Sequence, residues 1–120
     1  MARFLLSPLA EADIEGILAW THEHFGEVAR SRYEELLAQA ILDVAANPER
    51  PGCTARPELS EAARTYHLHY SRNNVSPAAN RVKRPRHFLL FRTADTGTVE
   101  IGRVLHDSMD LIRHLPPNFD

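Results

Sequence analysis

The sequence predicts an α+β fold, in which an N-terminal strand and a helical hairpin pack on a small, mostly antiparallel sheet. Apolar residues recur at helical spacing over residues 8–46, whereas the segments after residue 63 alternate with the period of strands. A chain of 120 residues without internal repeats fits one domain, residues 1–120.

The N-terminal strand is expected over residues 3–7, and a helix is expected to follow it at once. Ser7 precedes Pro8, a pair typical of a helix start, because a serine hydroxyl accepts a free amide and proline suits the first helical position. Gly26 is expected to end this helix. Its apolar face is expected to comprise Ala10, Ile14, Ile17, Leu18, Thr21 and Phe25.

A second helix is predicted from Glu27 to Ala46, ended by Asn47 and Pro48. Because only one glycine separates it from the first, the two helices should form an antiparallel hairpin. The apolar face of the second helix is expected to comprise Tyr33, Leu36, Leu37, Ala40, Ile41 and Val44.

Residues 48–63 hold three prolines and are expected to cross the molecule as irregular chain. A strand is then predicted over residues 64–70, with Tyr66, Leu68 and Tyr70 on one face and two histidines on the other. The remaining elements are two strands over residues 87–93 and 99–105, a hairpin turn at residues 95–97 between them, and a short helical turn over residues 111–115.

The last strand, Val99 to Leu105, contains an arginine among apolar residues. Strict alternation puts Val99, Ile101 and Arg103 on one face and Glu100, Gly102 and Val104 on the other. Such an arginine is either paired within the protein, with Glu100 or Asp110, or available to a partner.

Composition restricts the class of protein. Apolar residues make up 43% and charged residues 25% of the chain, as in ordinary globular proteins. The only cysteine, Cys53, excludes an internal disulfide and a cysteine-based zinc site. No apolar run is long enough to span a membrane. The apolar part of the first eight residues is too short for a signal peptide, so we expect a cytoplasmic protein.

Charge is distributed unevenly along the chain. Residues 1–60 hold 5 Lys or Arg and 10 Asp or Glu, whereas residues 61–120 hold 9 and 6. This imbalance is too weak to favour direct nucleic-acid binding. Residues 71–86 stand apart, because they contain five basic residues and no acidic one in a long connection between two strands.

The order of elements, with three sequence segments, resembles the ParE/RelE superfamily of bacterial toxins. The first segment, Leu6-Ser7-Pro8-Leu9-Ala10-Glu11-Ala12-Asp13-Ile14, is similar to the opening of the first helix in ParE toxins. The second runs from Arg32-Tyr33 through Leu42 and ends in Ala46-Asn47-Pro48. The third, Ile101-Gly102-Arg103-Val104-Leu105-His106-Asp107-Ser108-Met109-Asp110, is similar to the ending of ParE toxins. Residues 71–86 depart from the short connection usual in the family.

The resemblance implies the toxin of a type II toxin–antitoxin system, neutralised in a hetero-oligomer by a cognate ParD-like antitoxin. Antitoxins of this family typically wrap the toxin with a helix and an extended segment. ParE members are generally described as inhibitors of DNA gyrase, and RelE members as ribosome-dependent mRNA endoribonucleases. A binding module that has lost its toxicity is a third alternative.

The residues favour the ParE branch over the RelE branch. RNA cleavage by a 2′-hydroxyl needs a base, an acid and positive charge at the phosphate, which RelE toxins supply with clustered Lys and Arg and a C-terminal Tyr. Here no tyrosine follows Tyr70, and Lys83 is the only lysine. Arg64, Arg92, Arg103 and His106 form an incomplete set. We therefore expect no catalytic residues and no cofactor or metal.

Five residues are candidates for contact with the target or the antitoxin: Trp20, Arg92, Arg103, His106 and Asp110. Trp20 lies off the apolar face of its helix, which suits either an interface or a core. His67, His69 and His87 favour a polar sheet face over a zinc site. The basic loop of residues 71–86 is interpreted as a solvated extension, with contact to an acidic antitoxin or to nucleic acid near the target as the alternative.

Overall fold

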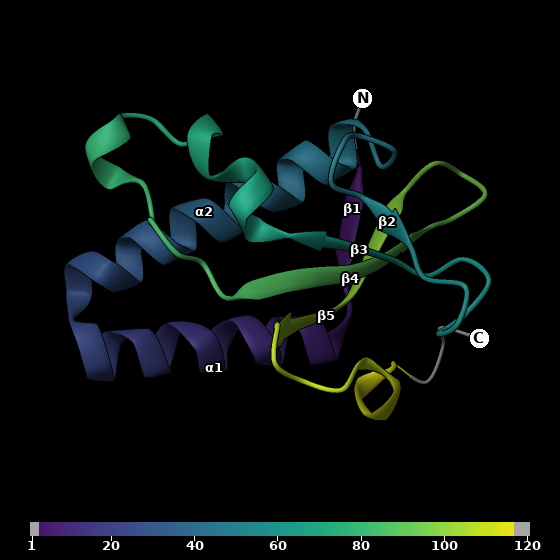
Figure 1. Ribbon diagram of the computed structural model, residues 1–120, viewed down its shortest axis with the longest axis horizontal. Coiled ribbons are helices and arrows are strands. Elements are labelled where there is room, and N and C mark those ends of the chain that lie inside the picture. The colour runs from purple at the N-terminus through teal and green to yellow at the C-terminus, as the bar shows by residue number, and fades with distance from the viewer. Residues whose placement is uncertain (1–2, 117–120) are drawn as a thin grey trace.

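The computed structural model describes residues 3–116 and contains two long helices on one sheet (Figure 1). The helices are α1 (Pro8–Phe25) and α2 (Glu27–Ala46). The strands are β1 (Phe4–Leu6), β2 (Thr54–Ala55), β3 (Arg64–His67), β4 (His87–Thr93) and β5 (Val99–His106). Three 3-10 helices complete the described chain: η1 (Leu68–Asn74), η2 (Ala78–Asn80) and η3 (Leu111–His114).

The sheet has the strand order β1-β5-β4-β3-β2. Strand β1 runs parallel to β5, and the other neighbours are antiparallel. This arrangement confirms the predicted α+β fold with its N-terminal strand and helical hairpin. No helix within residues 3–116 has the length and apolar content that crossing a membrane requires.

Local signals place the hairpin as predicted. The Ser7 hydroxyl accepts the Ala10 amide at 3.0 Å and so begins α1. Gly26 lies between the helices with a φ of 90°, a conformation that residues with a Cβ rarely adopt. Phe25 was expected on the buried face but is 68% exposed, because the end of the hairpin extends beyond the strands of the sheet (Figure 1).

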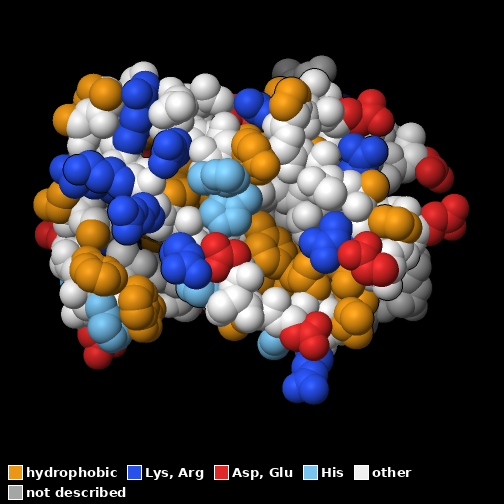
Figure 2. All heavy atoms as spheres, in the orientation of Figure 1, with side chains coloured by type: hydrophobic (Ala, Val, Ile, Leu, Met, Phe, Trp, Pro, Cys, Tyr) orange, Lys and Arg blue, Asp and Glu red, His pale blue; other side chains and the backbone are white. Residues whose placement is uncertain are grey.

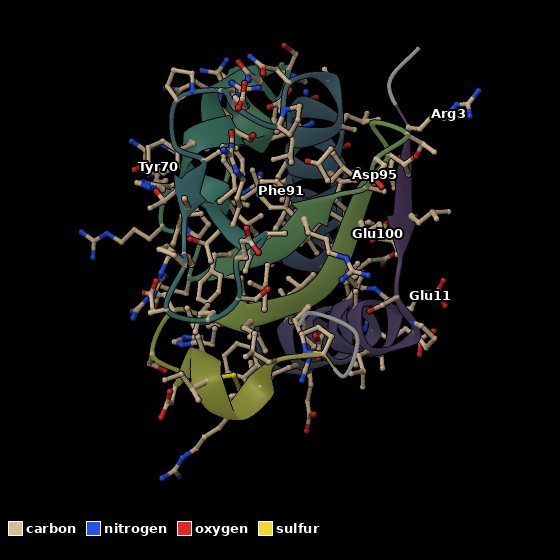
Figure 3. All side chains as sticks on the ribbon, turned by 90° about the vertical axis from the view of Figure 1, so that its right-hand side faces the viewer. Arg3, Glu11, Tyr70, Phe91, Asp95 and Glu100 are labelled. Carbon is tan, nitrogen blue, oxygen red and sulfur yellow. The ribbon has the colours of Figure 1, made fainter. Side chains whose placement is uncertain are left out.

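The core lies between α2 and one face of the sheet. All six apolar residues predicted for α2 are buried. They pack with Leu89 and Phe91 of β4, and Phe91 lies inside the molecule between the sheet and the helices (Figure 3). On β5 the core residues are Val99, Ile101 and Val104.

A β-bulge in β5 contradicts the alternation predicted for this strand. Leu90 pairs with Arg103, but the next residue, Phe91, pairs with Ile101, so Gly102 is an extra residue. After an extra residue in a strand, each following side chain lies on the sheet face opposite to the one that simple alternation predicts. Val104, rather than Arg103, therefore shares the core face with Val99 and Ile101.

Strand β3 ends earlier than predicted, at His67, and the chain continues as η1. Tyr66 and Leu68 are fully buried, but Tyr70 is half exposed. The Ser71 hydroxyl donates to Asp43 of α2 at 2.6 Å, and this contact requires the chain to leave the sheet. The histidines at 67 and 69 therefore do not lie two apart on one strand. The short strand β2 within residues 48–63 was also not predicted.

The basic loop is folded back against α2 rather than extended into solvent. Val75 is only 5% exposed and belongs to the core. The Arg81 guanidinium donates to the carbonyls of Val75 and Asn73 at 2.9 and 2.8 Å. Arg72 donates to the carbonyl of Lys83 at 2.7 Å. Hydrogen bonds along the loop thus define its path.

Candidate functional site

A groove of about 1130 Å³ lies between the helical hairpin, the end of β5 and residues 78–86 of the basic loop. Helices α1 and α2 and the loop contribute its walls, and the beginning of β4 and the end of β5 form its base. Its apolar lining includes Ile17, Trp20, Phe25, Val82 and Met109. A volume of this size accommodates several side chains of a partner.

Two aromatic side chains stand exposed at the hairpin end of the groove. Trp20 is 54% exposed and Phe25 is 68% exposed. The Trp20 ring stacks on His24 with centroids 4.2 Å apart and meets Phe25 edge-on at 5.7 Å. Large exposed aromatics that hold one another in place are typical of binding surfaces.

Cations also line the groove. Within residues 3–116, no acidic side chain forms an ion pair with Arg32, Lys83 or Arg84, all three of which line the groove. Lys and Arg side chains gather over the part of the surface where the loop lies (Figure 2). Asp13 is the groove's carboxylate, and Arg103 neutralises it at 2.8 Å.

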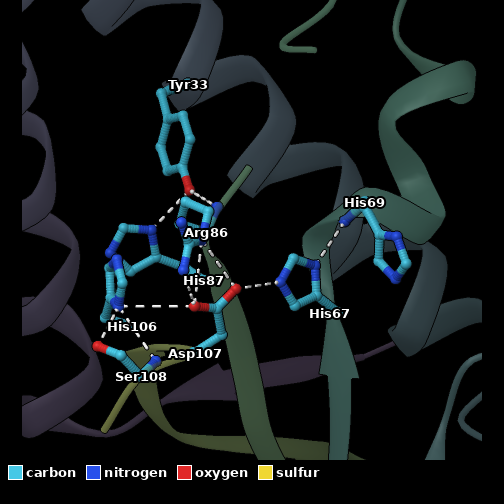
Figure 4. A network of polar contacts seen from close by, with 8 residues as sticks. All are labelled: Tyr33, His67, His69, Arg86, His87, His106, Asp107 and Ser108. Atoms are coloured by element: carbon cyan, nitrogen blue, oxygen red, sulfur yellow. Dashed lines mark hydrogen bonds and ion pairs between the residues drawn. The ribbon is translucent and has the colours of Figure 1, made fainter. Parts of the chain in front are cut away.

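At the base of the groove, the side chain of Tyr33 on α2 contacts residues at the beginning of β4 (Figure 4). Its hydroxyl accepts the Arg86 amide at 3.2 Å and lies 2.6 Å from Nδ1 of His87. Burial raises the pKa of Tyr33 to about 12. Burial, assisted by repulsion from His106, lowers the pKa of His87 to about 4. At neutral pH the phenol therefore donates to an uncharged imidazole.

Asp107, directly after β5, gathers the charged groups beside this pair (Figure 4). Both its oxygens accept from Arg86, with the shortest contact 2.9 Å from Nη2, and Oδ2 lies 3.1 Å from Nε2 of His67. Hydrogen bonds from Arg86, followed by that from His67, lower the pKa of Asp107 to about 2. Because His67 Nδ1 accepts the His69 amide, its Nε2 carries the proton donated to Asp107.

The structure separates the five candidate residues. Trp20, Arg103 and His106 line the groove, whereas Arg92 and Asp110 do not. Arg92 pairs with Glu100 at 2.7 Å, and Asp110 accepts the Ile112 amide at the start of η3. The ring of His106 lies 5.2 Å from that of His87, and its Nδ1 lies 2.7 Å from the Ser108 hydroxyl.

Arg103 is paired, but with neither Glu100 nor Asp110. Its guanidinium binds both oxygens of Asp13 on α1, at 2.8 and 2.9 Å, and also donates to the His114 carbonyl. The second function of Asp13 is to accept the Val104 amide at 2.9 Å. This carboxylate thus connects α1 to the part of β5 that extends beyond β1.

Sequence reasoning missed Tyr33, Arg86 and His87 as site residues. Tyr33 fits the apolar repeat of α2 and was expected only in the core, and its ring is indeed buried. The only sequence signal was a tyrosine in place of a leucine or isoleucine, since a buried phenol needs a polar partner. Among residues 3–116, no three His, Cys, Asp or Glu side chains are arranged to hold a metal ion.

Acidification should destabilise the protein through His87. Its pKa is about 4 when folded, against 6.5 for an ordinary histidine, so between these values the unfolded chain binds more protons. The free energy of unfolding should therefore fall as the pH drops from 6.5 to 4. After discounting for partial exposure, we expect a loss of roughly 2 kcal/mol.

Urea unfolding at pH 7, 6, 5 and 4.5 measures this dependence. His87→Gln should remove most of the slope, whereas His22→Gln, on the exposed side of α1, should leave it unchanged. Tyr33, His67, Arg86, His106 and Asp107 all act on His87, so the slope belongs to the cluster as a whole. A flat profile in the unmodified protein would contradict the assignment.

Comparisons with known proteins agree on one family. The family model described as the ParE toxin of the type II toxin-antitoxin system, parDE, matches residues 4–111. Toxin ParE1 of Mycobacterium tuberculosis strain H37Rv is 30% identical over 114 residues, which cover 95% of this chain and 98% of that relative. Toxin ParE1 of strain CDC 1551 / Oshkosh matches with the same values.

Proposed function

The chain belongs to the ParE toxin family of type II toxin–antitoxin systems, and from this membership we propose that a ParD-like antitoxin neutralises it by direct binding. Family membership implies an antitoxin partner. The proposal adds where that partner binds: in the groove between the hairpin and the basic loop, as part of a hetero-oligomer.

The observation that supports this most is the open groove with two exposed aromatics. Trp20 and Phe25 leave more than half of their surface in water, although both lie beside an apolar groove. Burying large apolar side chains stabilises a complex by about 1.5–3 kcal/mol each. A segment of the antitoxin that covers both aromatics would obtain much of its affinity from them.

We further propose that the free toxin inhibits growth through DNA gyrase in the cytoplasm. The arginines at 92 and 103 engage Glu100 and Asp13 in ion pairs. These ion pairs favour a structural role for both arginines over the binding of a reacting phosphate. Inhibition by contact needs only an accessible surface, and the antitoxin would block that surface by occupying it.

Growth under inducible expression tests the proposal. Expression of the chain alone should arrest growth, and co-expression with the protein encoded beside it should restore growth. Purified toxin should inhibit gyrase supercoiling. Binding of that neighbour without growth arrest would identify a non-toxic binding module, and neither binding nor rescue would overturn the proposal.

A paired substitution tests the place of binding. Trp20→Ala with Phe25→Ala should weaken the antitoxin complex about thirtyfold or more, which corresponds to about 1 kcal/mol for each truncated aromatic anchor. Leu5→Ala with Val28→Ala is the matched control, because these apolar side chains are equally exposed but lie outside the groove. Calorimetry on the purified proteins measures both; equal losses would argue against the groove.

An mRNA endoribonuclease is the second candidate, favoured by one observation. Tyr33, His87 and His106 lie together at the base of the groove, with Arg86 beside them. However, Asp107 neutralises Arg86 through paired hydrogen bonds, which removes the cation nearest to the histidines. If this candidate holds, His106→Ala abolishes mRNA cleavage in expressing cells and leaves antitoxin binding intact. Absence of cleavage by the unmodified protein eliminates it.

A further inference from the structure

We propose that the basic loop makes the groove selective for an acidic, amphipathic protein segment, which Lys83 and Arg84 bind together with Arg32 of α2. The proposal rests on the proposed function, in which this segment belongs to the antitoxin. It assigns to residues 71–86 a role in choosing the partner, which the fold of the toxin does not require.

The loop is built to hold a defined shape. The fully buried Ser71 donates to Asp43 of α2 at 2.6 Å, and the amide of Asn74 donates to the same carboxylate at 2.9 Å. Arg72 and Arg81 donate to carbonyls of the loop itself. Two of the five cations therefore maintain the loop, and Arg86 is bound by Asp107.

The remaining cations of the loop, Lys83 and Arg84, serve no such purpose. Both are exposed, line the groove, and form no ion pair within residues 3–116. Arg32 of α2 also lines the groove and is likewise exposed without an ion pair in this range. Like charges that share one groove repel one another, and an anionic partner relieves this repulsion. Because Arg103 already neutralises Asp13, the groove has a surplus of positive charge.

The lining favours a protein over a nucleic acid as the source of negative charge. Ile17, Val82 and Met109 add apolar surface to the same lining as the cations, and such surface suits apolar side chains of a partner rather than phosphates. An amphipathic segment with acidic and aliphatic faces complements both features.

Trp20, the only tryptophan in the chain, gives a direct measurement of what enters the groove. Its fluorescence is recorded while a synthetic 16-residue peptide without tryptophan, bearing glutamates on one helical face and leucines on the other, is added. The same peptide with lysines replacing the glutamates and a 16-nucleotide DNA, single- or double-stranded, are the alternative probes. The acidic peptide should shift the emission to shorter wavelength, with an affinity that falls between 50 and 200 mM salt.

The charge-reversed variant K83E/R84E should bind the acidic peptide at least about tenfold more weakly than the unmodified protein. The salt dependence of this binding should also be smaller. The matched control is R3E/R30E, which makes the same change of charge at two exposed arginines outside the groove; its affinity should stay within twofold. Circular dichroism establishes that both variants are folded. K83R should bind as the unmodified protein does.

Four outcomes would overturn the inference: no binding of the acidic peptide, equal binding of the lysine peptide, tighter binding of DNA, or unchanged affinity in K83E/R84E. None of them bears on growth arrest or on rescue by the neighbouring protein, which test the proposed function. Conversely, a protein that fails to arrest growth can still discriminate between the peptides. The two proposals can therefore fail separately.

Discussion

Replacing Asp13 by alanine should lower the free energy of unfolding by about 3 kcal/mol, because it breaks a largely buried ion pair and leaves its partner uncompensated. The side chains of Asp13 and Arg103 are only 15% and 17% exposed. The carboxylate also accepts the Val104 amide, which belongs to a stretch of β5 beyond its pairing with β1. The substitution thus removes three hydrogen bonds between α1 and the sheet.

Chemical denaturation of Asp13→Ala measures this loss. Asp13→Asn should cost about half as much, since an amide oxygen still accepts the Val104 amide but no longer balances the charge of Arg103. Glu15→Ala is the control on the exposed side of the same helix and should change stability by less than about 0.5 kcal/mol. If Asp13→Ala changed stability as little as Glu15→Ala, the ion pair of Asp13 and Arg103 would not stabilise the fold.

Replacing Asp43 by alanine should have a comparable effect, about 3 kcal/mol, and should also release the basic loop. Its carboxylate accepts from Ser71, Asn74 and Gln39 and lies 3.4 Å from Arg50. Although burial opposes it, these hydrogen bonds lower the pKa of Asp43. Without the carboxylate, the fully buried Ser71 hydroxyl keeps only the phenol of Tyr66 as a partner.

Hydrogen exchange separates the two consequences of Asp43→Ala. Amides of the loop should exchange faster than those of β4 and β5, because the loop loses its attachment to α2 while the sheet keeps its core. Glu35→Ala, at an exposed position of α2, is the matched control and should leave exchange in the loop unchanged. Uniform acceleration throughout the chain would show global destabilisation instead of local release.

The helical hairpin was predicted accurately because its signals are local. The cap at Ser7, the stop at Gly26 and the 3-4 spacing in α2 all act within one or two helical turns. The observed helices, Pro8–Phe25 and Glu27–Ala46, begin and end where the sequence predicts. Strand β4 and the turn after it follow from equally local patterns.

Strand ends and faces depend on distant residues and were predicted less well. The end of β3 is set by the bond from Ser71 to Asp43, 28 residues away. The faces of β5 depend on the bulge at Gly102, which appears only when β4 is beside it. An alternating pattern holds no information about an extra residue in one strand of a pair.

The sequence by itself determined the fold class, the helical hairpin and the family, because these depend on order, spacing and short motifs along the chain. Only the tertiary structure decided the site. It brought Tyr33 and His87, 54 residues apart, within hydrogen-bond distance, and it joined Arg103 to Asp13 across 90 residues. Such contacts arise when apolar faces pack and carry their polar neighbours with them. The loop shows the same division: its charge is visible in the sequence, but its position as a wall of the groove follows from packing against α2.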